Sequence, residues 1–217
     1  MQPGGLRVRA AAVSGATAET TIHGTNRYAY GANIGWLDLR NITTSGVAVG
    51  ASYCTGYVWS ANCGWIGLGN GPTNGFEYGN ASADDWGVNH DGEGRLSGYA
   101  YGANIGWITF EQTHGMPRVD LRTGLLSGYV WSANCGWIGF SNEYAQAQTE
   151  RLAPAPDSDG DGLPDDWESR RAGNLTELDG AGGDADGDGA PDAAEYAADT
   201  DPLDPADRLE IVSFSSQ

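Results

Sequence analysis

Residues Tyr57–Leu68, YVWSANCGWIGL, carry a motif that the chain repeats four times. The other copies begin as YAYGANIGWL at Tyr28, YAYGANIGWI at Tyr99 and YVWSANCGWI at Tyr129. The odd copies share AYGANIGW and the even copies share VWSANCGW, so a two-motif unit of about 71 residues is duplicated. Such a period predicts a repeat architecture in which each unit buries its apolar face against its neighbours.

Each of the last three motifs is embedded in the same order of predicted elements. A short β-branched strand is followed by a Gly-containing turn, a strand ending in Tyr-x-Tyr or Tyr-x-Trp, a turn at Ala-Asn, and a strand Gly-Trp-Ile. We therefore expect a mainly β fold of repeated three-stranded meander units over residues 1–145, with no helix before about residue 142. A sandwich, a propeller and a solenoid all satisfy this pattern. The motifs occupy residues 28–37, 57–68, 99–110 and 129–140.

Two positions of the motif are typical of turns. The repeated Asn can adopt left-handed backbone angles or hydrogen-bond the turn, and the Gly two residues later lets a neighbouring aromatic ring lie close to the backbone. These residues are Asn33, Asn62, Asn104 and Asn134, with Gly35, Gly64, Gly106 and Gly136.

Aromatic side chains dominate the motifs, which hold six of the eight Trp and open with a Tyr each. Because the rings recur at equivalent positions, we expect them to form the core by edge-to-face packing. The alternative is a row of exposed Trp and Tyr that binds a polysaccharide or another surface.

The acidic residues are concentrated at the end of the chain. The net charge is −18, and the segment from Glu150 onward holds 19 acidic residues and 4 arginines. The chain has no lysine, which excludes a basic nucleic-acid footprint, and no apolar stretch long enough for a membrane-spanning helix. Residues 146–156, which include APAP, are expected to be a stiff linker. The acidic segment 157–207 follows.

Residues Asp157–Glu168 (DSDGDGLPDDWE) and Asp184–Glu195 (DADGDGAPDAAE) have the spacing of the twelve-residue calcium loop. In that loop, carboxylates at positions 1, 3, 5 and 12 bind the ion, position 7 binds through its carbonyl, and position 9 binds directly or through water. Gly162 and Gly189 supply the sharp turn. Oxygen donors without nearby His or Cys favour Ca²⁺ over zinc or copper. The predicted ligands of two sites are Asp157, Asp159, Asp161, Leu163, Asp165 and Glu168, and Asp184, Asp186, Asp188, Ala190, Asp192 and Glu195.

These loops resemble those of the EF-hand family, with two departures. Position 8 is Pro164 or Pro191, which has no N–H to pair two loops, and Pro-rich or Gly-rich sequence replaces the helix before each loop. Short helices are expected only after the loops, over 167–172 and 193–198. The arrangement is similar to the thrombospondin type 3 and dockerin-like calcium repeats of secreted proteins, which implies a rigid calcium-bound spacer rather than a switch.

The β-repeat GYAYGANIGWI, with its lead-in VNHDGEGRLSG, resembles a repeat of secreted proteins from environmental bacteria, often placed before such calcium repeats. The resemblance covers about residues 22–207 and implies a secreted or cell-surface location. It brings no catalytic residues.

Three cysteines allow one disulfide and one free thiol. Cys54 with Cys63 is favoured, because the turn at Ser60–Asn62 can place them on facing strands. Cys63 with Cys135 is the second pairing, and three buried reduced thiols are the third interpretation.

No catalytic constellation emerges, since His23, His90 and His114 lie in unrelated contexts. We therefore expect a non-enzymatic, extracellular, calcium-binding structural or assembly protein. Strand-like segments at 6–9 and within the terminal segment 208–217 could pair with a sheet edge of another copy or of another cell-surface protein. The alternative is an adhesion module for a polysaccharide or another surface, and exposure of the Trp side chains distinguishes the two.

Overall fold

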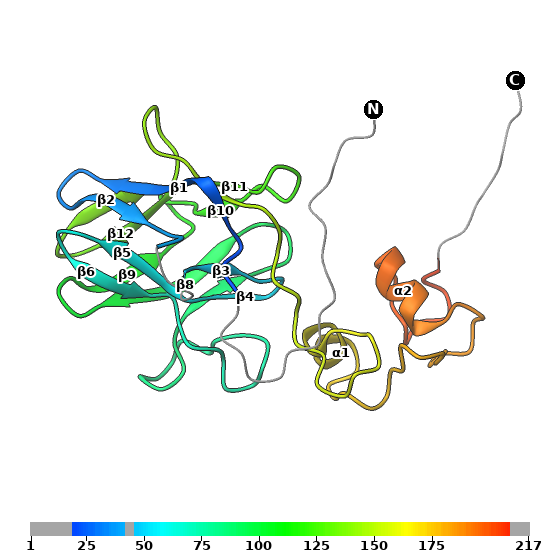
Figure 1. Cartoon of the computed structure of the whole chain (residues 1–217). Coiled ribbons are helices and arrows are strands. Elements are labelled where there is room, and N and C mark those ends of the chain that lie inside the picture. The colour runs from blue at the N-terminus through cyan, green and yellow to red at the C-terminus, as the bar shows by residue number, and fades with distance from the viewer. Residues whose placement is uncertain (1–18, 42–45, 209–217) are drawn as a thin grey trace, which may run out of the picture. The chain divides into compact units, whose positions relative to one another are not determined.

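The computed structural model describes residues 19–41 and 46–208, and these form fourteen strands and two short helices (Figure 1). The strands expected at residues 6–9 and from 209 onward lie outside the described residues. The chain divides into two compact units, Met1–Pro154 and Ala155–Gln217. The elements of the first unit are β1 (Ile22–Gly31), β2 (Gly35–Asp38), β3 (Ala48–Val49), β4 (Tyr53–Thr55), β5 (Tyr57–Ser60), β6 (Gly64–Gly67), β7 (Val88–His90), β8 (Leu96–Gly102), β9 (Gly106–Phe110), β10 (Arg118–Val119), β11 (Leu125–Ser127), β12 (Tyr129–Ser132), β13 (Gly136–Gly139) and β14 (Ala147–Thr149). The second unit contains α1 (Asp165–Arg171) and α2 (Asp192–Ala198).

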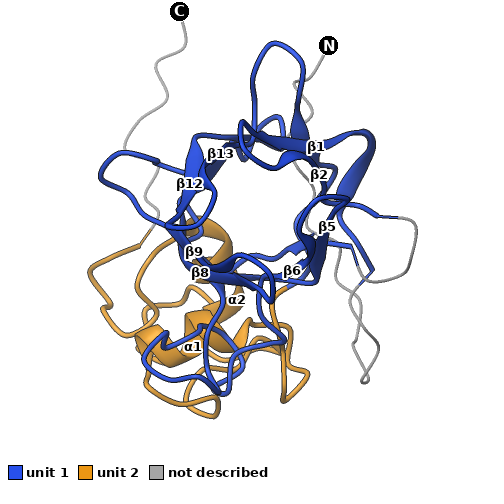
Figure 2. Cartoon of the chain, turned by 90° about the vertical axis from the view of Figure 1, so that its left-hand side faces the viewer, with its two compact units in different colours: residues 1–154 blue, residues 155–217 orange. Residues whose placement is uncertain are grey.

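Eight of the strands close into an antiparallel barrel, seen end-on in Figure 2. Each motif contributes one hairpin: β1–β2, β5–β6, β8–β9 and β12–β13. Neighbouring hairpins pair through β2–β5, β6–β8, β9–β12 and β13–β1. The mainly β prediction is confirmed, and the arrangement is a barrel rather than the sandwich, propeller or solenoid that the sequence left open.

The remaining strands extend the barrel sheet. β7 pairs with β8 before β8 turns into β9, and β3–β4 and β10–β11 precede the second and fourth hairpins. The first hairpin takes its flanking strand from the other end of this unit, because β14 pairs with the start of β1 at Ile22 and Arg27. In the described residues no helix precedes α1, as expected.

The Trp and Tyr rings of the motifs lie outside the barrel, which overturns the expectation that they form its core; Phe110 and Phe140 are buried. Successive side chains of a strand point to opposite faces. In each hairpin a small or aliphatic side chain faces inward while its neighbours, the rings, face outward. The inward residues of the hairpins are Ala29, Leu37, Val58, Ile66, Ala100, Ile108, Val130 and Ile138, all buried. The repetition therefore reflects equivalent outer positions of four hairpins.

The barrel interior is a packed apolar core. The opening between the ribbons in Figure 2 is filled by side chains, and the residual cavity of about 40 Å³ is lined only by apolar residues. An eight-stranded barrel is just wide enough for side chains to fill it. Function must therefore be sought on the outer surface or in the second unit.

The four motif Asn residues link each hairpin to the next. Every Asn amide donates a hydrogen bond to a carbonyl of the adjacent motif, at 3.0–3.1 Å, so that the bonds form a closed ring. The pairs are Asn33 to Cys135, Asn62 to Ile34, Asn104 to Cys63 and Asn134 to Ile105. Each motif Gly has a φ of +73° to +77°, and a Cβ there would lie 3.3–3.4 Å from a neighbouring Asn amide. The motif Gly therefore makes room for an Asn amide and not for the aromatic ring that we expected beside it. Aromatic rings lie close to other glycines, with Tyr57 against Gly67 and Tyr129 against Gly139.

All three cysteines are buried and free, which contradicts both disulfide pairings and agrees with the third interpretation. Burial raises the pKa of the Cys54 thiol to about 12, although a backbone hydrogen bond at Gly50 lowers it. Such thiols pack as small apolar groups. Among the described residues, no helix has the length and apolar character needed to cross a membrane.

Candidate functional site

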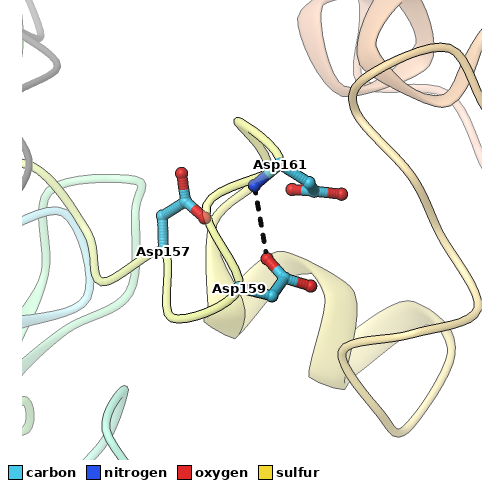
Figure 3. Close-up of side chains that lie close together, drawn as sticks. All are labelled: Asp157, Asp159 and Asp161. Carbon is cyan, nitrogen blue, oxygen red and sulfur yellow. Dashed lines mark hydrogen bonds between the residues drawn. The ribbon is translucent and has the colours of Figure 1, made fainter.

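The second unit brings the first three carboxylates of each acidic loop together. Asp157, Asp159 and Asp161 each offer an oxygen within 4.8 Å of the others, and Asp184, Asp186 and Asp188 do the same. Figure 3 shows the first group, with the Asp161 N–H donating to Asp159. Three converging carboxylates repel one another in the absence of a cation.

Both loops are held by the same backbone hydrogen bonds. The carboxylate at position 1, Asp157, accepts N–H groups from Gly160 at 2.8 Å and Gly162 at 3.2 Å. Asp184 accepts the matching pair from residues 187 and 189 at 2.9 and 3.1 Å. Gly162 and Gly189 have φ of +101° and +95°, as expected for the sharp turn.

The position-12 carboxylates are buried without sufficient partners. Glu168 is 0% exposed, and neither of its carboxylate oxygens has a hydrogen-bond partner among the described residues. Burial, and then the carboxylates of Asp159 and Asp161 and of residues 165 and 157, raise the pKa of Glu168 to about 7. Glu195 is 1% exposed; its Oε2 lacks a partner among the described residues, while Thr200 donates to its Oε1 at 3.3 Å. Burial, then Asp186, raises the pKa of Glu195. A buried charged group without partners is costly, so each Glu lies where a cation would stabilise it.

The position-9 carboxylates bond to the protein itself. Asp165 accepts the Ser158 N–H at 2.7 Å and the Ser158 hydroxyl at 2.6 Å. Asp192 accepts the N–H groups of Ala185 at 2.9 Å and Asp179 at 2.8 Å. These bonds join the end of each loop to its beginning, and metal ligation by either residue stays a prediction. The same is true of the carbonyl groups of Leu163 and Ala190.

The helices start at position 9 of the loops, one or two residues before the expected start. Pro164 and Pro191 precede them in extended backbone, and their missing N–H groups cost nothing at this end of a helix. Trp167 of α1 contacts Tyr196 of α2 edge-on, with ring centroids 5.3 Å apart. The two loop–helix segments thus pack together within the second unit.

The second candidate site is the outer surface of the barrel, where twelve aromatic rings are 36–50% exposed. We call this set the aromatic belt. Its members are Tyr28, Tyr30, Trp36, Tyr57, Trp59, Trp65, Tyr99, Tyr101, Trp107, Tyr129, Trp131 and Trp137. Each hairpin supplies three rings, and the Trp of its second strand lies opposite the middle ring, as Trp65 lies opposite Trp59. Large exposed apolar surfaces on a soluble domain mark interaction sites.

Edge-to-face and tilted contacts join the belt rings within each hairpin. Trp36 contacts Tyr28 and Tyr30 with centroids 5.9 and 5.4 Å apart, and Trp107 contacts Tyr99 and Tyr101 at 6.0 and 4.9 Å. The rings are therefore fixed before any ligand arrives, which lowers the entropy lost on binding.

A signal for this surface was present in the sequence. The residues between the rings are Ala or Val, which suit the narrow interior of a barrel, whereas two Tyr or Trp per strand would overfill it. Side-chain alternation along the strand therefore places the rings outside.

A scan against protein-family models and searches of the curated proteins and of the solved structures found no match. The resemblance to secreted bacterial repeat proteins stays an expectation.

Proposed function

We propose that the protein is a non-catalytic binding module that holds a neutral polysaccharide against the aromatic belt. The observation that carries this proposal is the outward orientation of the rings around the barrel. An indole or phenol ring offers an apolar face to the C–H groups of a sugar and a polar edge to its hydroxyls. The belt rings are not part of the core, because other buried apolar residues, Phe110 and Phe140 among them, fill the barrel.

The charge of the chain favours a neutral ligand. Before Glu150 the chain holds 10 acidic residues, 7 arginines and no lysine, so the barrel unit has no excess of positive charge with which to bind an anionic polymer. The assembly function expected from the sequence depends on terminal strands outside the described residues, whereas the exposed Trp side chains favour the binding alternative.

Affinity electrophoresis through gels containing hydroxyethylcellulose, glycol chitin or galactomannan tests the proposal. We expect retardation in at least one neutral gel and none in alginate. The bound polymer should also reduce acrylamide quenching of Trp fluorescence. The Trp167→Phe variant, which lacks the Trp of the second unit, should show the same protection. Migration unchanged in all three neutral gels would contradict the proposal, as would binding that leaves quenching unaltered.

We also propose that each acidic loop binds one Ca²⁺. The support is the buried carboxylate of Glu168, which lacks a partner among the described residues beside three converging aspartates, and the matching arrangement at Glu195. The carboxylates and carbonyls predicted from the loop spacing would hold the ion. Its positive charge would offset the repulsion among the carboxylates. Sites of extracellular modules have dissociation constants of about 10⁻⁴ to 10⁻³ M, which suits the proposed secreted or cell-surface location.

Titration calorimetry of chelator-treated protein tests the calcium proposal. Two Ca²⁺ should bind, and Glu168→Gln and Glu195→Gln should each weaken one site by about tenfold or more, since a bidentate carboxylate is lost. Glu177→Gln, at an exposed position between the loops, is the matched control and should bind two ions unchanged. Absence of heat from Ca²⁺ binding to the wild-type protein would refute the proposal.

A further inference from the structure

The seam between the third and fourth hairpins contains a surface hollow of about 310 Å³. It lies where β9 pairs with β12, with Thr109 opposite Trp131, and Trp131 in turn lies opposite Trp137. Ligand sites usually begin at about 300 Å³, so the hollow has room for a small ligand or one unit of a polymer. Its lining residues are Thr109, Glu111, Thr113, His114, Trp131 and Trp137.

Glu111 gives the hollow a fixed, ionised hydrogen-bond acceptor. Its carboxylate accepts the N–H groups of Thr113 at 2.7 Å, of His114 at 3.1 Å and of Gly115 at 2.6 Å. Burial raises the pKa of Glu111, but the hydrogen bonds from Gly115, His114 and Thr113 outweigh it and hold the pKa below its ordinary value. The carboxylate is therefore positioned to accept further hydrogen bonds, as sugar hydroxyls would donate.

The other three seams differ at the position of Thr109. At the first seam, Asp38 lies opposite Trp59 and forms a 2.6 Å ion pair with Arg27. At the two remaining seams the residue is glycine, Gly67 or Gly139, against which the ring of Tyr57 or Tyr129 lies. Only the third seam, among the described residues, presents a hydroxyl beside two belt Trp rings and a carboxylate.

We infer that this hollow is the principal sugar subsite of the aromatic belt and that it takes a neutral hexose unit of the polymer. The inference rests on the proposed function. Trp131 and Trp137 supply the apolar platform, while Glu111 and the Thr109 hydroxyl bind sugar hydroxyls. Among the described residues only one carboxylate lines the hollow, whereas most glycosidases use an acid and a second carboxylate on either side of the bond that they cleave. The ligand is therefore held intact.

Affinity electrophoresis of the full chain tests the inference. Gels with a series of concentrations of hydroxyethylcellulose, glycol chitin or galactomannan give the affinity for each polymer. Trp131→Ala should weaken binding about tenfold, as loss of a central aromatic anchor does. Thr109→Val keeps the shape, removes the hydroxyl, and should weaken binding about threefold, as loss of one hydrogen bond does. The matched control is Trp59→Ala, at the same motif position and with 40% exposure against 39% for Trp131. It should change affinity by less than about twofold, because rim contacts contribute little.

The results separate the inference from the proposed function. Equal losses in the Trp59→Ala and Trp131→Ala variants would overturn the subsite and leave the belt as the binding surface. Unretarded wild-type protein in all three gels would overturn both. If the Thr109→Val variant and the Trp131→Ala variant both bind with wild-type affinity, the ligand binds elsewhere on the belt.

Discussion

His90, the last residue of β7, is a titratable side chain buried in the barrel unit at 1% exposure. Its Nδ1 lies 2.9 Å from the carbonyl of Gly50, and its Nε2 has no hydrogen-bond partner among the described residues. Burial lowers the pKa of His90, against opposite effects of Gly50, Asp91 and Ala51. A neutral ring with its proton on Nδ1 can donate to the Gly50 carbonyl, which gives His90 a structural role.

Acid should therefore destabilise the barrel through His90. Because its pKa is lower in the folded than in the unfolded state, the unfolded chain takes up the proton first. The stability that neutral His90 contributes to the folded state is fully present above its unfolded pKa of about 6.5. It is lost as the pH falls toward the pKa of His90 in the folded protein. A difference of one pKa unit between the folded and unfolded states corresponds to about 1.4 kcal/mol of folding stability. Denaturant midpoints followed by Trp fluorescence should thus fall between pH 7 and pH 5.

The control is His90→Asn, which retains a donor for the Gly50 carbonyl but cannot titrate. It is expected to be less stable at pH 7, because it leaves a cavity, and to lose less stability on acidification than the wild type. Titration of the acidic loops is common to both proteins and cancels in the comparison. Parallel pH dependences in the two proteins would contradict this role.

At the scale of the element, the hairpin is what the motif specifies best. Turns at Ala-Asn and strands beginning at Gly-Trp follow from local chemistry, and both occur as expected in β2, β6, β9 and β13. The bond that each Asn makes is less predictable, because its acceptor lies 28 to 102 residues away in sequence. The direction of the rings was mispredicted because alternation defines two faces, and the small Ala and Val side chains mark the inner face only once the strands are known to close into a barrel.

Asn104→Asp tests the ring of amide bonds between hairpins. Asp has nearly the same shape but cannot donate to the Cys63 carbonyl 3.1 Å away, and its charge is repelled there. We expect a loss of about 1–3 kcal/mol in the free energy of unfolding, measured by urea denaturation. Asn104→Ala, which removes the donor without adding charge, should lose less. Ala103→Ser, at the exposed neighbouring turn position, is the control and should leave the free energy of unfolding unchanged. An unchanged free energy of unfolding in the Asn104→Asp variant would show that the ring of amide hydrogen bonds does not stabilise the barrel.

At the scale of the molecule, the two candidate sites differ in how far sequence could define them. Each acidic loop holds its predicted Ca²⁺ ligands within twelve residues, so the spacing alone is enough to predict them, and their binding of Ca²⁺ stays a proposal. The hollow combines Thr109 with Trp137 across two hairpins and exists only once the barrel has closed. Closure depends on β13 meeting β1 and on β14 flanking β1, which are long-range pairings that repeats at regular spacing do not specify. The same motifs could have stacked linearly instead of closing.

The two units should also differ in their dependence on Ca²⁺. The barrel has a continuous core of buried apolar residues, whereas the described part of the second unit buries chiefly Leu163, Leu178 and carboxylates. Its helices have seven residues each, well below the roughly 12–15 at which an isolated helix becomes marginally stable. Without a cation, the buried Glu168 and Glu195 oppose folding of this unit, so chelation should unfold residues 157–207 and leave the barrel intact.

Limited proteolysis with mass spectrometry, with EDTA or with Ca²⁺, measures this difference. In EDTA, cleavage should be confined to residues 157–207, and a fragment containing the barrel should persist. The Trp167 emission should shift to longer wavelength as its contact with Tyr196 is lost, while the Trp167→Phe variant, which reports only on the barrel unit, should show no shift. Because salt screens close, partly buried charges only weakly, added NaCl at equal ionic strength should restore protection less than Ca²⁺ does. Equal protease resistance in EDTA and Ca²⁺ would show that the acidic unit folds without an ion. In that case Glu168 would be buried in its protonated, neutral form, which its pKa of about 7 allows.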